Sequence, residues 1–180
     1  LEARNYDLVI TMTHLYDLEP LEFGKQVKAI RPGVPVVLLV TDLTDLQHYH
    51  LPEKTEGIDK IFYWTGDSAL FLAITKYFED VKNADTDSKR GMVRVILVIE
   101  NSSRFYSLFL PQIYTEVMHQ TNDLVAQGLN EHERLLRRRA RPKILLAENY
   151  EEAMDIYKKY KENMLAIITD VTYSRGGVKE

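Results

Sequence analysis

The 180-residue sequence predicts an α/β protein in which parallel sheets are covered by helices on both faces. Short apolar runs of strand length alternate with segments of helical periodicity. This alternation occurs twice, with a polar stretch between the two series. Hydrophobic residues make up 45% of the chain and charged residues 28%, which is the balance of an ordinary globular protein. We therefore expect two partial α/β units.

The first series contains three expected strands and two expected helices. The strands are Tyr6–Thr11, Val34–Val40 and the weaker run Ile58–Tyr63. A helix is expected over Pro20–Ile30, because its apolar residues have helical spacing and Arg31-Pro32-Gly33 follows. A stronger amphipathic helix follows the third strand. Its apolar stripe consists of Leu70, Ala73, Ile74, Tyr77, Phe78 and Val81.

A polar stretch over residues 83–92 is expected to be a linker, which divides the chain into residues 1–82 and 93–180. The second series then begins. Its expected strands are Val93–Ile99, Lys143–Ala147 and Met164–Thr169. Asn149 and Glu152 have the spacing of a capping box, so a helix is expected from there to Tyr160.

The segment between the first two strands of the second series, about residues 103–141, is too long for a simple crossover. Leu110, Val117 and Leu124 are seven residues apart, which predicts a long helix with an apolar stripe. The stripe either packs on its own sheet or forms a dimer or domain interface. Gly128, followed by Asn130 and Glu133, marks the end of one helix and the capped start of another.

Composition excludes several classes of site and partner. The net charge is −4, so neither nucleic acid nor an acidic membrane surface is an expected partner. The chain has no cysteine, no signal peptide and no apolar run of about 18 residues, so a cytoplasmic protein is expected. It begins at Leu1 rather than Met and stops after a strand, so we expect a piece of a longer protein.

A basic cluster between Arg134 and Lys143 contains no aromatic residues for base stacking, so ion pairing is expected there rather than nucleic-acid binding. The cluster consists of Arg134, Arg137, Arg138, Arg139, Arg141 and Lys143.

Four tyrosines are expected to pack helices on the sheets with their hydroxyl groups at the surface. These are Tyr106, Tyr114, Tyr157 and Tyr160.

An internal repeat directs attention to one carboxylate. Tyr6–Thr13 aligns without gaps on Met164–Val171, and Met12 then stands where Asp170 stands. Asp170 follows a predicted parallel strand, so it faces the crevice where open α/β sheets bind ligands. Glu100 and Asn101 follow another such strand, and these three residues are candidate Mg²⁺ ligands. Asp170 could then act as a nucleophile and become an aspartyl phosphate.

This pattern resembles the receiver domains of bacterial response regulators. Val95–Asn101 resembles the first receiver strand, with Glu100 and Asn101 in the acidic pair, and Asp170 matches the phosphoacceptor. Val34–Thr41 resembles the fourth strand, which ends in the switch threonine, here Thr41. Asp59–Thr65 resembles the fifth strand, which ordinarily ends in Lys-Pro, where this sequence has Trp64 and Thr65. The resemblance implies flavodoxin-like topology, with strands three to five of one receiver followed by strands one to three of the next.

The departures from the receiver pattern imply a degenerate module. Met12 cannot accept a phosphoryl group, and Trp64 cannot supply the cation that pairs with it. We expect a non-catalytic signalling module that binds protein domains, either of its own chain or of a parent enzyme. The alternative is a working receiver, phosphorylated on Asp170 with Mg²⁺ in a two-component phosphorelay, with a histidine kinase as partner. A homodimer through the long helix, or through exchanged halves, fits either hypothesis.

A second resemblance concerns two phrases, Gly128–Ala153 and Thr169–Glu180. They look like the regulatory region ahead of the PEP/pyruvate-binding domain in some bacterial phosphoenolpyruvate synthase-like proteins. The resemblance implies a parent phosphotransferase that uses ATP and a phosphohistidine to phosphorylate pyruvate. This chain contains neither a Gly-rich phosphate loop nor a swivelling-histidine segment, so we expect it to be a non-catalytic regulatory fragment of such an enzyme.

Overall fold

The computed structural model describes residues 5–48, 56–139, 141–171, 174–175 and 178–179. The chain forms two compact units, Leu1–Ser68 and Ala69–Glu180. Each unit contains a three-stranded parallel sheet with helices, so the α/β class predicted from the sequence is confirmed.

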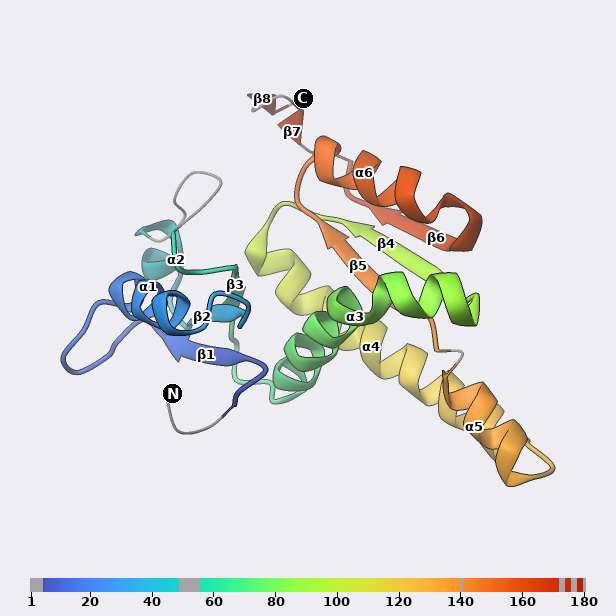
Figure 1. Cartoon of the computed structure of the whole chain (residues 1–180). Coiled ribbons are helices and arrows are strands. Elements are labelled where there is room, and N and C mark those ends of the chain that lie inside the picture. The colour runs from blue at the N-terminus through green and yellow to red at the C-terminus, as the bar shows by residue number, and fades with distance from the viewer. Residues whose placement is uncertain (1–4, 49–55, 140, 172–173, 176–177, 180) are drawn as a thin grey trace. The chain divides into compact units, whose positions relative to one another are not determined.

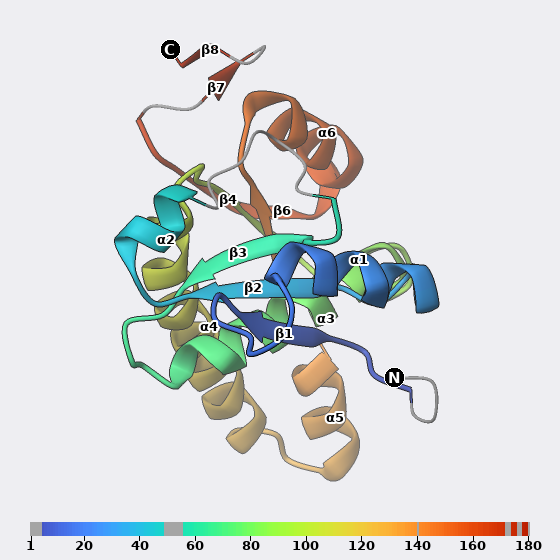
Figure 2. The same cartoon turned by 90° about the vertical axis from the view of Figure 1, so that its left-hand side faces the viewer.

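The first unit alternates strands and helices along the chain (Figures 1 and 2). Its elements are β1 Val9–Met12, α1 Pro20–Ile30, β2 Val36–Val40, α2 Leu43–His48 and β3 Lys60–Tyr63. The sheet has the order β1-β2-β3 and all strands are parallel. Met12 pairs with Leu39, and Val40 pairs with Tyr63, so the three strands end at one edge of the sheet.

Strand β2 is the core of the first unit, because all five of its residues are buried. Leu38 and Val40 lie on the face that α1 covers, where they contact half-buried apolar side chains. These side chains are Leu21, Ile58, Ile61 and Tyr63. At the opposite end of the strands, the Asp59 carboxylate accepts the Val36 N–H at 2.6 Å and pairs with Lys28 at 2.6 Å.

Two glycines bring backbone segments into close contact in the first unit. A Cβ at Gly24 of α1 would lie 2.5 Å from the carbonyl oxygen of Gly57. Gly57 has φ 99°, and a Cβ there would lie 2.5 Å from the Lys25 nitrogen. These positions require glycine because a side chain would separate α1 from the segment that leads into β3.

The second unit begins with a long helix and contains the remaining elements. These are α3 Ala69–Gly91, β4 Val95–Ile99, α4 Ser103–Ala126, α5 Glu131–Arg139, β5 Lys143–Ala147, α6 Tyr150–Tyr160, a 3₁₀ turn Lys161–Asn163 and β6 Met164–Thr169. The parallel sheet has the order β5-β4-β6. The short strands β7 Ser174–Arg175 and β8 Val178–Lys179 pair with each other in antiparallel fashion.

The strand orders agree with the predicted flavodoxin-like halves. A doubly wound sheet of this type has the order 2-1-3-4-5. The order β5-β4-β6 reproduces its first three strands, and β1-β2-β3 reproduces its last three. Strands β1 and β6, which the internal repeat aligned, therefore occupy the same position in the topology and each lies at a sheet edge.

The expected linker over residues 83–92 is wrong, since α3 continues as one helix to Gly91. The boundary between the compact units lies at Ser68 instead of residue 82. The stretch is polar because most of that half of α3 faces solvent, while Ala84 and Ser88 continue its buried face. Asp80 also belongs to the buried face, whereas Val81, which the sequence assigned to it, is 49% exposed. Met92 follows the helix with φ 49° and turns the chain toward β4.

Helices cover both faces of the second sheet along β4 and β5 (Figure 1), whereas residues 165–169 of β6 are exposed. Val95 and Leu97 of β4 contact α6 through Ala153, Ile156 and Tyr160. The opposite face is covered by α4, whose Tyr106, Leu110 and Tyr114 are fully buried. The predicted helical insertion is confirmed as α4 and α5. The predicted caps are also confirmed, because the side chains of Asn130 and Asn149 accept the N–H groups of Glu133 and Glu152.

Candidate functional site

The carboxyl edge of the second sheet brings together the residues that the sequence selected. The Asp170 N–H donates to the Ile99 carbonyl oxygen at 3.0 Å, so Asp170 lies beside the end of β4. Glu100 follows Ile99, and its own N–H donates to the Ala147 carbonyl oxygen at 3.0 Å. Glu100, Asn101 and Asp170 are therefore neighbours at the ends of adjacent parallel strands.

Both carboxylates at this edge already have backbone partners. Glu100 is 5% exposed, and its Oε1 accepts the Ser102 N–H at 2.8 Å. Asp170 Oδ1 accepts the Val171 N–H at 2.6 Å. Mg²⁺ takes oxygen ligands in octahedral geometry and can be held by one or two carboxylates and water. Glu100, Asn101 and Asp170 could supply two carboxylate groups and one amide oxygen. Among the described residues, no group of three or more Asp, Glu, His or Cys side chains is arranged to hold a metal ion.

The carboxyl edge of the first sheet carries the three residues that the sequence analysis compared with receiver positions, Met12, Thr41 and Trp64. Met12 ends β1 with its side chain exposed, and Thr41, also exposed, follows β2. Trp64 follows β3, where its backbone N–H donates to Val40 O at 2.8 Å and its indole N–H donates to Asp67 O at 3.3 Å. The three positions lie at the ends of neighbouring strands, as in a receiver, but they offer neither a carboxylate nor an amine.

A polar contact beside Met12, which sequence reasoning missed, fixes the loops of this edge. The Thr13 hydroxyl donates to Asp45 Oδ2 at 3.0 Å, which joins the end of β1 to α2. Because the hydroxyl has one hydrogen, the 2.9 Å contact between Thr13 Oγ1 and His14 Nδ1 requires the imidazole to donate. His14 Nδ1 lies 3.7 Å from the same carboxylate oxygen. The loop after β1 is thus held against the start of α2.

Around this contact, the edge exposes apolar side chains among acidic ones. The exposed apolar residues are Met12, Leu15, Tyr16 and Leu43, which we call the apolar edge. Asp17 and Asp42 lie in the same loops. The Thr44 N–H donates to Asp42 at 2.6 Å and holds the pKa of that carboxyl below its usual value, so Asp42 is charged at neutral pH. The loop segments 13–19, 41–45 and 64–68 contain no Lys or Arg.

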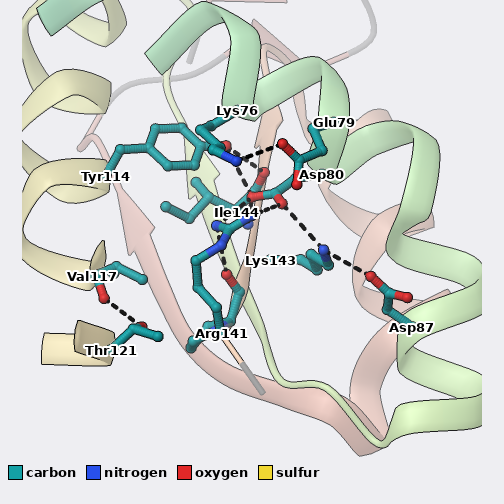
Figure 3. A network of polar contacts seen from close by, with 11 residues as sticks. Lys76, Glu79, Asp80, Asp87, Tyr114, Val117, Thr121, Arg141, Lys143 and Ile144 are labelled. Atoms are coloured by element: carbon teal, nitrogen blue, oxygen red, sulfur yellow. Dashed lines mark hydrogen bonds and ion pairs between the residues drawn. The ribbon is translucent and has the colours of Figure 1, made fainter. Parts of the chain in front are cut away.

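A buried ion network lies elsewhere in the second unit (Figure 3). Asp80 of α3 has no solvent exposure. Arg141 donates to both of its carboxylate oxygens, the Tyr114 hydroxyl donates to it at 3.1 Å, and the Ile144 N–H donates to it at 3.0 Å. Lys143 Nζ lies 3.5 Å from Asp80 and 2.8 Å from Asp87.

The network attaches α3 to the edge strand β5. The Lys143 N–H points toward β4 and donates to the carbonyl oxygen of Arg94, the residue ahead of that strand. The next N–H of β5, that of Ile144, therefore points away from the sheet, where Asp80 accepts it. Burial alone would lower the pKa of Arg141. The hydrogen bonds and the negative charge of Asp80 outweigh burial, so the pKa of Arg141 lies above its usual value. Burial, reinforced by Asp80, raises the pKa of Tyr114, so its hydroxyl remains a donor.

The network corrects one expectation from the sequence and confirms part of another. The Tyr114 hydroxyl is buried and does not reach the surface. Two members of the basic cluster, Arg141 and Lys143, form the expected ion pairs, whereas the side chains of Arg137, Arg138 and Arg139 lie outside the described residues. Because Asp80 and its partners are buried and mutually satisfied, the network stabilises the fold and is no binding site.

Comparisons of the chain with protein-family models, with curated proteins and with solved structures found no match. In the part of the chain that the structure describes, none of the helices has both the length and the apolar character needed to cross a membrane.

Proposed function

We propose that this chain is a regulatory signalling module of receiver type that has lost phosphoryl transfer and acts by binding protein. The observation that carries the proposal is the apolar edge of the first unit. Met12, Leu15, Tyr16 and Leu43 are exposed where a working receiver gathers its phosphoacceptor and cation. Exposed apolar groups that share one edge of a folded unit are typical of interaction surfaces.

The chemistry of the first unit supports binding rather than catalysis. A thioether at Met12 cannot form an acyl phosphate, because it has no oxygen nucleophile. The indole of Trp64 donates to a backbone carbonyl and cannot provide a positive charge for a phosphoryl group. Aromatic and Met side chains are, however, enriched in the centres of protein interfaces.

The second candidate function is phosphorylation of Asp170 in the second unit. It is favoured by the hydrogen bond from the Asp170 N–H to Ile99, which sets this carboxylate beside Glu100. Asn101 weakens this candidate, because an amide lacks the charge of the second carboxylate in a receiver pair. We therefore rank it below protein binding.

Intact-mass spectrometry after incubation with acetyl phosphate and Mg²⁺ distinguishes the two functions. We expect no gain in mass on incubation, either for the wild-type chain or for Asp170→Asn. A gain of one phosphoryl group, about 80 Da, that disappears in Asp170→Asn would overturn the proposal in favour of a working receiver. Asp155→Asn on the surface of α6 is the matched control for the loss of one carboxylate.

We further propose that the module works in the cytoplasm. The absence of cysteine from a chain of 180 residues fits a reducing compartment, since stabilising disulfides are not used. Its partners would be protein domains, rather than nucleic acid or lipid, because the chain carries a net charge of −4.

A further inference from the structure

We propose that a second copy of this chain pairs with β6 along its open edge, so that the two β6 strands run antiparallel and join two three-stranded sheets into one. Every residue of this contact belongs to the second unit, and none belongs to the apolar edge of the first unit. The inference therefore goes beyond the proposed function, and each can hold or fail without the other.

The two edges of the second sheet differ in whether they can accept another strand. At the β5 edge, Asp80 accepts the Ile144 N–H that points away from the sheet, so the buried ion network occupies that side. Strand β6 forms the other edge (Figure 1). It contains neither a charged side chain nor a proline, which are the usual protections of an edge strand against pairing. The sheet can therefore be extended at β6.

The backbone of β6 determines which groups a partner would meet. The Asp170 N–H donates to the Ile99 carbonyl oxygen, and backbone groups alternate along a strand, so those of Ile168 also face β4. The N–H and C=O groups of Ile167 and Thr169 consequently point away from the sheet. Among the described residues, no other strand pairs with β6 on that side. Alternate donors and acceptors of this kind are matched by another β-strand.

The side chains of β6 favour an apolar strand as the partner. Ile167 lies beside Leu97 on the face that α6 covers, and Ile168 lies beside Val98 on the opposite face. Neither helix reaches them, since Ile167 is 47% exposed and Ile168 is 44% exposed. Branched apolar side chains of this kind are stabilised by similar side chains on a neighbouring strand.

Charge at the two ends of β6 identifies the partner as a second copy. The exposed Arg94 side chain donates to the Met164 carbonyl oxygen at 2.9 Å, which places its guanidinium at the amino end of β6. Asp170 follows the carboxyl end of the same strand. In an antiparallel pair, the amino end of each strand lies beside the carboxyl end of the other. Arg94 of each copy therefore approaches Asp170 of the other, and this attractive contact is made twice.

The outward-pointing residues also determine the register of the pair. A two-fold axis at Ile168 sets Ile167 opposite Thr169 of the other copy, and each such pair exchanges two hydrogen bonds, about four in all. The two Ile168 residues then form a non-hydrogen-bonded pair at the axis, with Cα atoms about 4.5 Å apart. A contact between two short strands is smaller than a standard interface of about 1,200–2,000 Å², so we expect a weak, reversible dimer.

Sedimentation velocity between about 10 µM and about 1 mM covers the range of such a weak dimer. Ile167→Pro removes one outward N–H and leaves the hydrogen bonds to β4 intact, because proline is tolerated where the N–H of an edge strand faces solvent. We expect this variant to raise the dissociation constant at least about tenfold, since both copies lose a hydrogen bond. Ile167→Ala is the matched control, because it shortens the side chain but keeps the N–H, and its effect should stay below about threefold.

A charge exchange tests the antiparallel orientation without altering the strand itself. Arg94→Glu alone, or Asp170→Arg alone, should raise the dissociation constant about fivefold or more, because both end contacts become repulsive. An equimolar mixture of the two variants should return it to within about twofold of the wild-type value, since both contacts are then attractive again. Arg104→Glu and Asp155→Arg reverse exposed charges elsewhere in the second unit and should leave the dimer unchanged.

Several outcomes would overturn the dimer. A wild-type chain that stays monomeric at about 1 mM would do so, as would a dimer unaffected by Ile167→Pro or a mixture of folded charge variants that stays monomeric. Tyr16→Ser alters only the apolar edge and should leave the dimer unchanged. Loss of the dimer in Tyr16→Ser would place the contact on the apolar edge instead and overturn this inference. Phosphoryl labelling would overturn the proposed function without changing the sedimentation of the unlabelled chain.

Discussion

Replacing Asp80 with Ala removes the centre of the buried network that holds α3 on β5. The carboxylate accepts hydrogen bonds from the side chains of Arg141 and Tyr114 and from the Ile144 N–H, and it has no solvent exposure. Without it, the Ile144 N–H loses its acceptor, and the Tyr114 hydroxyl keeps only a 3.5 Å contact with the Ile144 carbonyl oxygen. The Arg141 side chain, only 11% exposed, is left without its partner charge.

The magnitude follows from burial. Breaking a buried ion pair by removing one partner costs about 3–5 kcal/mol, because the remaining charge stays desolvated. Lys143 limits the loss, since it retains its 2.8 Å contact with Asp87. We therefore expect Asp80→Ala to lower the free energy of unfolding by about 3–4 kcal/mol. Most domains have a free energy of unfolding of only about 5–15 kcal/mol, so the variant should be barely stable enough to fold.

Urea denaturation followed by far-ultraviolet circular dichroism measures this loss. Asp85→Ala on the same helix is the matched control, because Asp85 is 48% exposed and pairs with Lys159 at the surface. Asp85→Ala should lower the free energy of unfolding by less than about 1 kcal/mol. The double variant Asp80→Leu/Arg141→Met should recover part of the loss, since it removes both buried charges. If Asp80→Ala cost less than Asp85→Ala, the reasoning about burial would be refuted.

Three further predictions concern backbone geometry and pH. Gly24→Ala should destabilise the chain by about 1–3 kcal/mol through its contact with a backbone carbonyl, while Gly33→Ala, with open space around it, should not; equal effects in thermal denaturation would contradict this. Met92→Gly should raise stability by about 1 kcal/mol, because Met92 has φ 49° and an exposed side chain; unchanged stability in urea would argue against strain there. Hydrogen bonds from Lys159 and Tyr160 hold the pKa of Asp85 below its ordinary 3.8, so its small contribution is present above that pH and is lost as the pH falls through the lower folded pKa. In an acid titration of stability, wild type and Asp85→Asn should therefore converge at low pH, and a constant difference would contradict the assignment.

The sequence predicts the sheets well because parallel strands leave a strong local signal. Runs such as Val36–Val40 and Val95–Ile99 are buried on both faces, so nearly all their residues are apolar. The topology could also be anticipated, since the alignment of Met12 with Asp170 relates the two edge strands. The apolar runs and the internal repeat both involve residues that are close together in the sequence, so they can be recognised without the structure.

The rest could not be predicted because it depends on contacts between distant residues. Asp80 looks like a solvent-facing residue until Arg141, 61 positions later, lies against it. The polar half of α3 resembles a linker for the same reason, because composition does not reveal that Ala84 and Ser88 face inward. A signal was available, however, in the helical spacing of Tyr77, Asp80, Ala84 and Ser88.

At the candidate sites, the sequence identified the strand-end positions but missed what surrounds them. Strand ends can be located from the apolar runs, and Glu100 and Asp170 are neighbours as the topology requires. The apolar edge could not be recognised, because Leu15 and Leu43 read as ordinary core residues until their exposure is known. The contact between Thr13 and Asp45 spans 32 residues and has no local signature.

The central claim, that phosphoryl transfer has been lost, is tested most directly by nuclear magnetic resonance. Mg²⁺ and beryllium fluoride, which mimics a phosphoryl group, would be titrated together into the isotopically labelled chain. The amide signals of Asn101, Asp170 and Val171 report on the carboxyl edge of β4 and β6. We expect these signals to shift no further in the wild-type chain than in the Asp170→Asn variant. A saturable shift confined to these amides and absent from Asp170→Asn would contradict it.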